Sequence, residues 1–372
     1  MLSPTPLKVL IVDDTIVYRK IVGDVIAEIP GVEVVGSAHN GRAAMLKIKT
    51  LQPDLLTLDI EMPEMNGLEL LEQMKQIAPD TGAVMLSTLT HEGGAMTMRA
   101  LELGAFDFIP KPQSGTMAEN KLAVKEALAP ILKAFARRRQ ITGMLRRTTP
   151  PVAKPPSRTA PNACRPGIVS RKSSDVSSII AIGISTGGPN ALARMLPMLP
   201  KDVGVPVVIV QHMPPMFTQS LAKSLDAKCA LTVREATHGE PLTPNVVYIA
   251  PGGKQMKITA GPDGRQRIIK ITDDPPENSC KPSVDYLFRS IAELYVGRAT
   301  GVIMTGMGSD GTAGLRQMKN KGAFVIAQDE STCVVFGMPK EPAEQGIADV
   351  VAPLDQIPSE IVKTLAINGW GR

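Results

Sequence analysis

Residues 179–189 read Ile-Ile-Ala-Ile-Gly-Ile-Ser-Thr-Gly-Gly-Pro, and this stretch decides the fold of the C-terminal half of the chain. Its first six residues form an apolar run typical of a buried strand, and a helical pattern starts at Pro189. The Gly-Ile-Ser-Thr-Gly sequence fits the G-x-S-x-G pattern, in which glycines allow a tight turn. The stretch therefore predicts a strand, a turn that lifts Ser185 above the edge of a sheet, and a helix.

The same alternation of strand and helix continues toward the C-terminus. Short apolar runs alternate with segments of helical periodicity, which is typical of a parallel sheet covered by helices. We therefore expect a doubly wound, Rossmann-like α/β domain over residues 177–368. Its strands are expected at 179–184, 206–211, 246–250, 300–304 and 323–327, and its helices at 189–196, 217–225, 284–295 and 315–321.

A second pattern of this kind lies in the N-terminal part of the chain. Five short apolar runs alternate with helical segments, so residues 7–130 predict a smaller doubly wound parallel sheet of the flavodoxin-like kind. A length of 372 residues agrees with two domains. The strands are expected at 9–12, 32–38, 55–58, 83–86 and 106–109, and the helices at 16–29, 42–51, 68–77, 94–103 and 117–139.

Between the two patterns, residues 131–176 are rich in proline, serine and arginine, and we expect them to form an extended basic linker. Residues 131–175 hold eleven lysines and arginines but one aspartate, so the rest of the chain is mildly acidic although the net charge is +5. Such a linker is suited to contact nucleic acid, an acidic protein surface or anionic lipid. A solvated spacer is the other interpretation.

Composition favours a cytoplasmic protein. No apolar run reaches about 18 residues, which predicts no membrane span. The first residues lack a charged segment followed by a long apolar one, so we expect no signal peptide. Four cysteines without metal-ligand spacing predict free thiols in a reducing compartment. These cysteines are Cys164, Cys229, Cys280 and Cys333.

Polar residues follow the strands of the N-terminal pattern. Asp13 and Asp14 end the first strand, and Asp59 ends the third. Ser87 ends the fourth strand, and Lys111 follows the fifth. The carboxyl ends of parallel strands face one crevice, so these groups converge there. Clustered carboxylates suit Mg²⁺, and a metal-held carboxylate beside a lysine is suited to accept a phosphoryl group.

Three stretches of this half carry a resemblance to the response-regulator receiver family over about residues 7–130. They are Val-Asp-Asp at 12–14, Leu-Asp-Ile-Glu-Met-Pro-Glu-Met-Asn-Gly-Leu at 58–68 and Lys-Pro at 111–112. The resemblance implies that a histidine kinase phosphorylates Asp59. It also implies a Mg²⁺ site and a set of switch residues. The metal ligands are Asp13, Asp14 and Asp59, and the switch residues are Ser87, Phe108 and Lys111.

Two further details accompany this resemblance. Cis peptide bonds occur mainly before proline, so Lys111-Pro112 is expected to be cis. Asn66 stands where many relatives have aspartate, outside the acidic pocket.

Ser185 needs a base, and histidine is the usual choice. The chain has four histidines, of which His39 and His91 lie in the N-terminal pattern and His238 lies in an apparent exposed turn. His212 directly follows the strand at 206–211, on the carboxyl edge of the sheet. The sequence therefore favours His212 as the general base.

The base in turn needs an orienting carboxylate. Asp310 lies in Thr-Gly-Met-Gly-Ser-Asp-Gly at 305–311, after the strand at 300–304. Three strand ends thus direct Ser185, His212 and Asp310 to one crevice, and the Thr186 amide is a candidate oxyanion donor. A phosphate-binding loop is the rival interpretation of the glycine-rich turn, but the Walker lysine is absent.

The order Ser…His…Asp excludes the α/β-hydrolase family, in which the histidine comes last. The half instead resembles the chemotaxis protein-glutamate methylesterase (CheB) family over about residues 179–352. The matching stretches include Val-Gln-His-Met-Pro-Pro-Met-Phe-Thr at 210–218, Met-Thr-Gly-Met-Gly-Ser-Asp-Gly at 304–311 and Cys-Val-Val-Phe-Gly-Met-Pro at 333–339. This resemblance implies the same triad and adds the Met307 amide as an oxyanion donor. His238 and Cys280 depart from the aspartate and histidine of enteric relatives.

The resemblance implies a phosphorylation-activated serine esterase that acts on glutamate γ-methyl esters of chemoreceptor cytoplasmic segments. It also implies deamidation of receptor glutamines and phosphorylation by a CheA-type histidine kinase. Mg²⁺ is expected for the receiver, and no metal for the ester chemistry. Two rivals stay open, a transcriptional regulator with a nucleic-acid-binding C-terminal half and an interaction module with an inert triad. Acidic balance and the absence of an evident helix-turn-helix argue against DNA as a partner.

Overall fold

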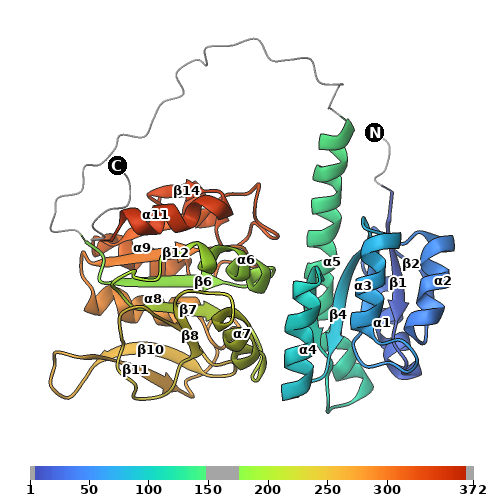
Figure 1. The fold of residues 1–372 in the computed structure, drawn as a ribbon, viewed down its shortest axis with the longest axis horizontal. Helices are drawn as coiled ribbons and strands as arrows, with labels where there is room; N and C mark the ends of the chain where they lie inside the picture. The colour runs from blue at the N-terminus through green and yellow to red at the C-terminus, as the bar shows by residue number, and fades with distance from the viewer. Residues whose placement is uncertain (1–4, 148–175, 366–372) are drawn as a thin grey trace, which may run out of the picture.

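The computed structural model describes residues 5–147 and 176–365, which form two α/β domains (Figure 1). Of the predicted linker, residues 148–175 lie outside the described part of the chain. Each domain is built on one parallel sheet, and the smaller sheet comes first. The predicted fold class is therefore confirmed.

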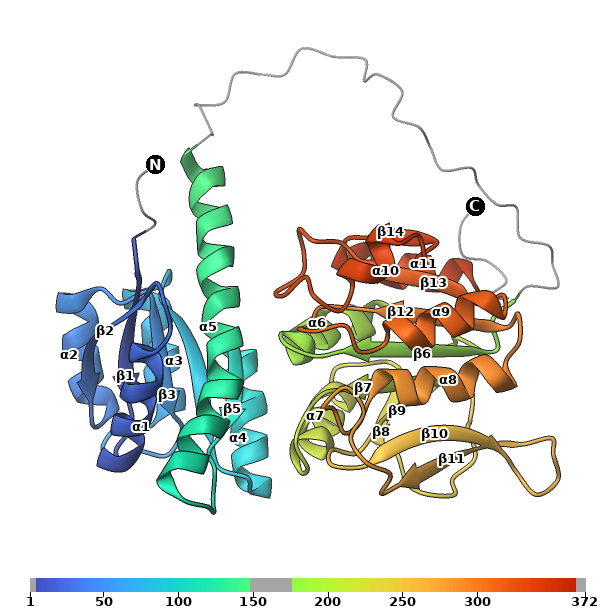
Figure 2. The same ribbon diagram turned by 180° about the vertical axis from the view of Figure 1, so that it is seen from behind.

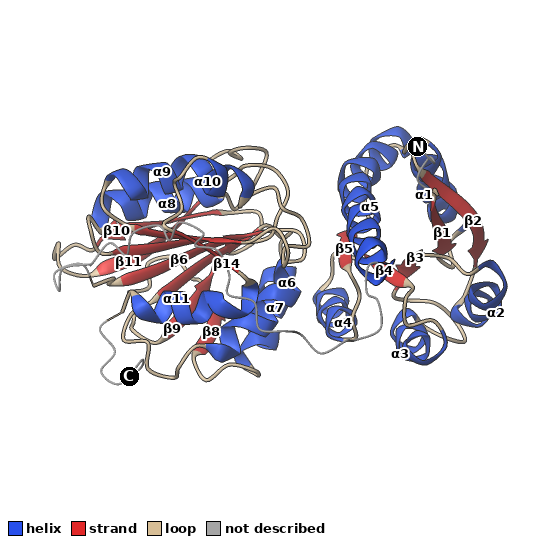
Figure 3. Ribbon diagram, turned by 90° about the horizontal axis from the view of Figure 1, so that it is seen from above, coloured by secondary structure: helices blue, strands red, loops and turns tan. Residues whose placement is uncertain are grey.

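The N-terminal domain has a five-stranded sheet of order β2-β1-β3-β4-β5, in which all neighbouring strands are parallel. Helices α1 and α5 cover one face, and α2, α3 and α4 cover the other (Figure 3). The strands are β1 (Leu7–Val12), β2 (Val32–Ala38), β3 (Leu55–Asp59), β4 (Gly82–Ser87) and β5 (Asp107–Pro110). The helices are α1 (Ile16–Ala27), α2 (Gly41–Leu51), α3 (Gly67–Ile77), α4 (His91–Glu102) and α5 (Met117–Arg147).

The start of α3 explains why asparagine is suitable at position 66. The Asn66 side chain accepts a hydrogen bond from the Glu69 amide at 2.9 Å, and the Glu69 carboxylate accepts one from the Asn66 amide at 2.9 Å. This reciprocal capping box satisfies two amides that the first helical turn leaves without partners. Asn66 therefore stabilises the helix end.

Helix α5 ends later than expected. The sequence predicts its end near residue 139 and the start of the linker at 131, but the helix continues to Arg147. Alanine, leucine, lysine and arginine favour helix, and they make up much of residues 131–147. The prediction places the start of the linker where the excess of lysine and arginine begins. Such an excess does not distinguish a basic helix from a basic coil.

The C-terminal domain has a seven-stranded parallel sheet of order β14-β13-β12-β6-β7-β9-β8. Helices α8, α9 and α10 lie on one face, and α6, α7 and α11 on the other (Figure 3). The strands are β6 (Ile179–Ile184), β7 (Val207–Gln211), β8 (Thr232–Glu235), β9 (Val246–Ile249), β12 (Ala299–Ile303), β13 (Phe324–Gln328) and β14 (Val350–Ala352). The helices are α6 (Gly188–Met195), α7 (Phe217–Asp226), α8 (Val284–Leu294), α9 (Thr312–Asn320), α10 (Lys340–Glu344) and α11 (Ile357–Lys363).

Some elements of this domain are absent from the sequence-based expectation. They are β8, β14, the antiparallel hairpin of β10 (Gln255–Ala260) and β11 (Arg267–Thr272), and the short helices near the C-terminus. Strands β8 and β11 are partly exposed and contain charged residues, so they lack the continuous apolar run that marks the central strands. Strand β14 is apolar but has only 3 residues.

The two domains meet where α4 packs against α6 and α7 (Figures 1 and 2). The rings of Phe108 and Phe217 stack across this contact, with centroids 4.8 Å apart and an interplanar angle of 24°. Apolar side chains from both domains join one continuous core here. They include Met98, Leu101, Leu221 and Leu225.

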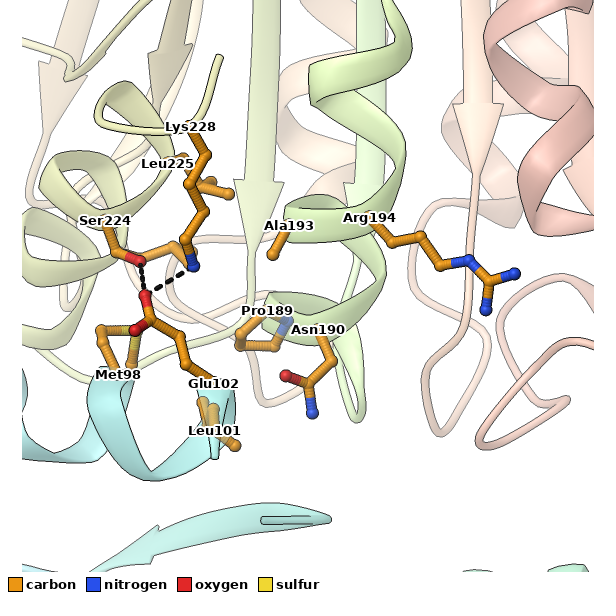
Figure 4. A pocket seen from close by; sticks show the side chains of 11 residues that line it. Met98, Leu101, Glu102, Pro189, Asn190, Ala193, Arg194, Ser224, Leu225 and Lys228 are labelled. Carbon is orange, nitrogen blue, oxygen red and sulfur yellow. Dashed lines mark hydrogen bonds and ion pairs between the residues drawn. The ribbon is translucent and has the colours of Figure 1, made fainter. Parts of the chain in front are cut away.

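A small cavity of about 280 Å³ remains at this interface (Figure 4). At its edge, Glu102 accepts hydrogen bonds from Ser224 at 2.8 Å and Lys228 at 2.5 Å. Pro189 and Asn190 of α6 line the opposite side. The contact between domains therefore combines an apolar centre with a polar edge.

The expectation of a cis Lys111-Pro112 bond is wrong, because this bond follows the ordinary trans preference. Within the described residues the cis bond is Lys281-Pro282. Among the helices of residues 5–147 and 176–365, none is both long and apolar enough to cross a bilayer.

Candidate active site and phosphorylation site

Three neighbouring strands bring the predicted triad to one edge of the larger sheet. Strand β6 lies between β12 and β7. The Ser185 amide donates to the Thr305 carbonyl at 3.0 Å, and the His212 amide donates to the Ile184 carbonyl at 3.1 Å. These bonds continue the sheet for one residue beyond each strand. The backbones of Ser185 and His212 are therefore held side by side.

The turn after Ser185 depends on glycine. Gly187 has φ +74°, the left-handed region that glycine adopts readily. A Cβ at this position would lie 2.5 Å from a methyl group of Val334. The Gly188 amide donates to the Ser185 carbonyl at 2.7 Å, and the Gln211 side chain donates to the same oxygen at 3.0 Å. The loop that presents Ser185 is thus packed on both sides.

Asp310 lies in the loop between β12 and α9, where it is buried against the N-terminus of α8. Its carboxylate accepts hydrogen bonds from several donors. Its Oδ2 lies 2.8 Å from Nε2 of His212. Four other groups donate to the same carboxylate and hold it in place. They are the Asn278 amide group at 2.9 Å, the Ser283 hydroxyl at 2.9 Å, the Val284 amide at 2.7 Å and the Asp285 amide at 3.2 Å. The helix N-terminus favours the negative charge.

Asp310 and His212 each shift the pKa of the other. Burial disfavours the Asp310 carboxylate, but hydrogen bonds from His212, Asn278 and the Val284 amide outweigh it and lower the pKa to about 2. Burial also disfavours a charged His212, yet Asp310 and the nearby Cys280 thiol raise the pKa of the ring to about 9. Because ionised Asp310 only accepts, Nε2 of His212 carries the proton.

Nδ1 is therefore the His212 nitrogen that can take a proton from a nucleophile. Among the described residues, the Ser185 hydroxyl makes no hydrogen bond with this ring. The Cys280 thiol lies 3.7 Å from Nδ1 instead. Catalytic hydrogen bonds often tighten only when substrate binds. The adjacent backbones of Ser185 and His212 therefore count for more than the missing hydrogen bond between their side chains.

The two predicted oxyanion donors lie in loops beside Ser185. Gly306 approaches closely, since a Cβ there would lie 2.7 Å from Cβ of Ser185. Met307 follows it and is half exposed. In the described part of the chain, neither the Thr186 amide nor the Met307 amide donates a hydrogen bond to protein. Both N–H groups are thus available to a bound oxyanion.

Sequence reasoning missed the residues that support the triad. Ser283 is the N-cap of α8, and a serine before a helical pattern is a readable signal. Asn278 lies in a loop with φ +51°, and nothing in the sequence directs it to Asp310. Thr305 ties two loops together, because its hydroxyl donates to the Thr186 carbonyl and accepts from the Val335 amide, both at 3.0 Å.

The acidic pocket of the N-terminal domain gathers the residues that the sequence singled out. Nζ of Lys111 lies 2.8 Å from Asp13 and 2.7 Å from Asp59, and all three side chains are buried. Burial, with the charges of Asp13 and Asp14, raises the pKa of Asp59 to about 6 despite Lys111. The pocket therefore holds more negative charge than Lys111 neutralises.

This excess charge fits a divalent cation. Carboxylate oxygens of Asp13, Asp14 and Asp59 all lie within 4.8 Å of one another. An all-oxygen set of this kind is the chemistry that Mg²⁺ prefers.

Two of the predicted switch residues, Ser87 and Phe108, lie between this pocket and the domain interface. The Ser87 hydroxyl accepts a hydrogen bond from Thr97 at 2.7 Å. Ser87 directly follows Leu86, the residue of β4 that pairs with Asp59 of β3. The Phe108 ring stacks on Phe217 of the second domain. Few residues therefore separate Asp59 from the contact with the C-terminal domain.

The interface also reaches the loop that carries Ser185. The Asp107 carboxylate accepts a hydrogen bond from the Gly187 amide at 3.2 Å, and Asn190 donates to the Ala105 carbonyl at 3.1 Å. Burial raises the pKa of Asp107 to about 6, although bonds from Phe108 and Gly187 amides oppose this rise. The N-terminal domain thus contacts the chain two residues from Ser185.

Comparison with known proteins matches both domains to families. Residues 9–122 match the response regulator receiver domain, and residues 180–361 match the CheB methylesterase family. A CheB methylesterase catalytic domain from Thermotoga maritima shares 44% identity and covers 51% of this chain and 99% of its own, with a TM-score of 0.49. The response regulator domain of Thermotoga maritima CheB shares 39% identity over 36% of this chain and 97% of its own, with a TM-score of 0.32.

Curated relatives cover nearly the whole chain. A protein-glutamate methylesterase/protein-glutamine glutaminase of Desulfotalea psychrophila is 57% identical over 97% of this chain and 99% of its own. One of Nocardioides sp. with the same name is 41% identical over 97% of this chain and 96% of its own. With a receiver domain followed by a methylesterase domain, the chain belongs to the CheB protein-glutamate methylesterase family.

Proposed function

We propose that this chain is a phosphorylation-controlled serine esterase that hydrolyses glutamate γ-methyl esters on chemoreceptors and deamidates receptor glutamines. The observation that carries the proposal is the His212–Asp310 pair, fixed beside Ser185 at the carboxyl edge of the sheet. The names of the curated relatives support the choice of substrate. A cytoplasmic location stays a prediction.

The roles of the triad follow from its hydrogen bonds. Nδ1 of His212 accepts the Ser185 proton as Oγ attacks the ester carbonyl, while Nε2–H stays bonded to Asp310. The protonated ring then gives its proton to the departing methoxide, and methanol leaves. Water next attacks the acyl-enzyme by the same route, which releases glutamate and restores Ser185. A glutamine amide would follow the same path, with ammonia as the leaving group.

The developing oxyanion needs donors that protein groups do not occupy. The Thr186 and Met307 amides meet this condition and lie on the two loops that flank Ser185. One such donor typically lowers a barrier by about 3 kcal/mol.

The receiver is proposed to control access through the interface. A receiver domain implies Mg²⁺-dependent phosphorylation, with a histidine kinase as the general class of phosphodonor. Asp59 would be the acceptor, Asp13 and Asp14 would complete the Mg²⁺ site, and Ser87 and Lys111 would contact the phosphoryl group. Mg²⁺ would offset the charge that develops on the transferring phosphoryl group. A shift of Phe108 would then break its stack with Phe217 and loosen the contact near Gly187.

The test is release of methanol from a methylated receptor fragment, with and without a small phosphodonor and Mg²⁺. Ser185→Ala should abolish release, and Asp59→Ala should keep the basal rate but lose the stimulation. Labelling of Ser185 by a serine-directed phosphonate separates a working triad from an inert one. Full activity of Ser185→Ala would refute the assignment of the nucleophile.

A further inference from the structure

Cys280 has no role in the proposed chemistry, although it lies against the catalytic base. Its thiol is 3.7 Å from Nδ1 of His212 and is half buried. The backbone fixes it there, because the Cys280 and Glu277 amides and carbonyls bond reciprocally at 2.8 and 3.1 Å. The Gln255 side chain also donates to the Cys280 carbonyl at 3.3 Å. The backbone thus holds a free thiol next to an imidazole nitrogen.

The separation of these two atoms matches two ligands of one tetrahedral zinc ion. Zinc binds thiolate sulfur at about 2.3 Å and imidazole nitrogen at about 2.1 Å. At a tetrahedral angle, those lengths place sulfur and nitrogen about 3.6 Å apart. The observed distance between Sγ of Cys280 and Nδ1 of His212 is 3.7 Å. A zinc ion would therefore fit between them with little movement of either side chain.

The far side of the imidazole is arranged as in a metal site. A metal-bound histidine usually donates its other N–H to a carboxylate, which fixes the ring and makes it more basic. Nε2 of His212 makes this bond with Asp310 at 2.8 Å, and four further donors hold the carboxylate. The ligand atoms that His212, Cys280 and Asp310 offer lie within 4.8 Å of one another. The tautomer required for zinc at Nδ1 is already set.

We propose that Cys280 and His212 bind a thiophilic divalent cation such as Zn²⁺, with Asp310 orienting the ring and water completing the coordination. The ion would occupy the lone pair of Nδ1 that must accept the Ser185 proton, so zinc inhibits the esterase. Mg²⁺, which prefers oxygen ligands, binds the carboxylates of the receiver and not this site. The inhibition rests on the proposed function, whereas the binding does not.

The other described cysteines provide matched controls. Cys229 and Cys333 are also free and partly buried, and burial raises the pKa of both thiols. Neither belongs to a group of potential metal ligands among the described residues. A serine at Cys229 therefore removes a thiol of similar exposure without touching the candidate site.

The test uses Co²⁺ as a spectroscopic probe on the full chain. A thiolate-to-cobalt charge-transfer band should appear with one equivalent of Co²⁺, disappear in Cys280→Ser, and persist in Cys229→Ser. Should Cys280→Ser fail to fold, His212→Ala gives the same test, because it removes the nitrogen ligand and keeps every thiol. Ser185→Ala should keep the band without activity, so binding is measured even if the esterase assignment fails.

Activity provides the second readout. The concentration of Zn²⁺ that halves methanol release should rise at least tenfold in Cys280→Ser relative to Cys229→Ser, each compared with its own zinc-free rate. A cobalt band that survives in Cys280→Ser, or that is lost equally in Cys229→Ser, would overturn the site. Equal zinc sensitivity of the two serine variants would overturn the inhibition.

Discussion

The pH dependence of the esterase gives the sharpest test of the His212–Asp310 pair. The base must be neutral to accept the Ser185 proton, and its pKa is raised to about 9. At pH 7 only roughly 1% of the rings would be neutral, so kcat/KM should rise about tenfold per pH unit between pH 7 and 8. It should level off above about pH 9. An ordinary histidine would reach its plateau already near pH 7.5.

The assay is initial methanol release at low substrate concentration, with phosphodonor and Mg²⁺ present throughout so that the interface does not limit the rate. Ser185→Ala measures the alkaline hydrolysis of the ester, which is subtracted at each pH. A profile that is flat from pH 7 to 9, or half-maximal near 6.5, would refute the raised pKa of His212.

The same pair has a consequence for stability, with a defined sign. The folded-state pKa of His212 lies above its usual 6.5, so the stabilisation is fully present below pH 6.5 and is lost as pH rises through about 9. The pKa of Asp310 is lowered from 3.8 to about 2, so the stabilisation is also lost as pH falls through that range. The bond between His212 and Asp310 contributes to both shifts, so it stabilises the fold most between these two limits.

Three substitutions test other parts of the arrangement. Asn278→Asp replaces the donor to Asp310 with a charge and tolerates the left-handed backbone, so kcat should fall at least tenfold with KM little changed in steady-state kinetics. Gly187 has a positive φ, and in Gly187→Ala the new Cβ would overlap Val334. This substitution should lower the free energy of unfolding by about 2 kcal/mol or more, measured by urea denaturation. Asp107→Ala removes the acceptor of the Gly187 amide and should raise methanol release several-fold without phosphodonor. An unchanged basal rate would exclude Asp107 from control of the interface.

The core of the fold and the gathering of the candidate site residues at one edge of each sheet follow from the sequence for one physical reason. Central parallel strands are buried on both faces, so they read as continuous apolar runs, and functional residues follow them at the carboxyl ends. Ser185, His212 and Asp59 each directly follow or end such a run. Their placement therefore needed only the topology of the sheet.

The supporting residues do not follow from this rule. Asn278 and Cys280 reach the triad from a loop between β11 and α8 whose course depends on positive φ at Asn278 and Ser279. A local pattern carries no information about where such a loop returns. The same limit applies to the domain interface, since Phe217 reads as an ordinary core residue of α7 until Phe108 is placed against it.

The position of Asp107 and Phe108 explains how one chain can join a phosphate switch to an ester site. The two residues are adjacent on β5, so their side chains leave the strand in opposite directions. Phe108 stacks on α7, and Asp107 reaches the amide two residues after Ser185. Because Lys111 pairs with Asp59 from the same strand end, one short segment of the chain joins the proposed phosphorylation site to the loop that carries Ser185.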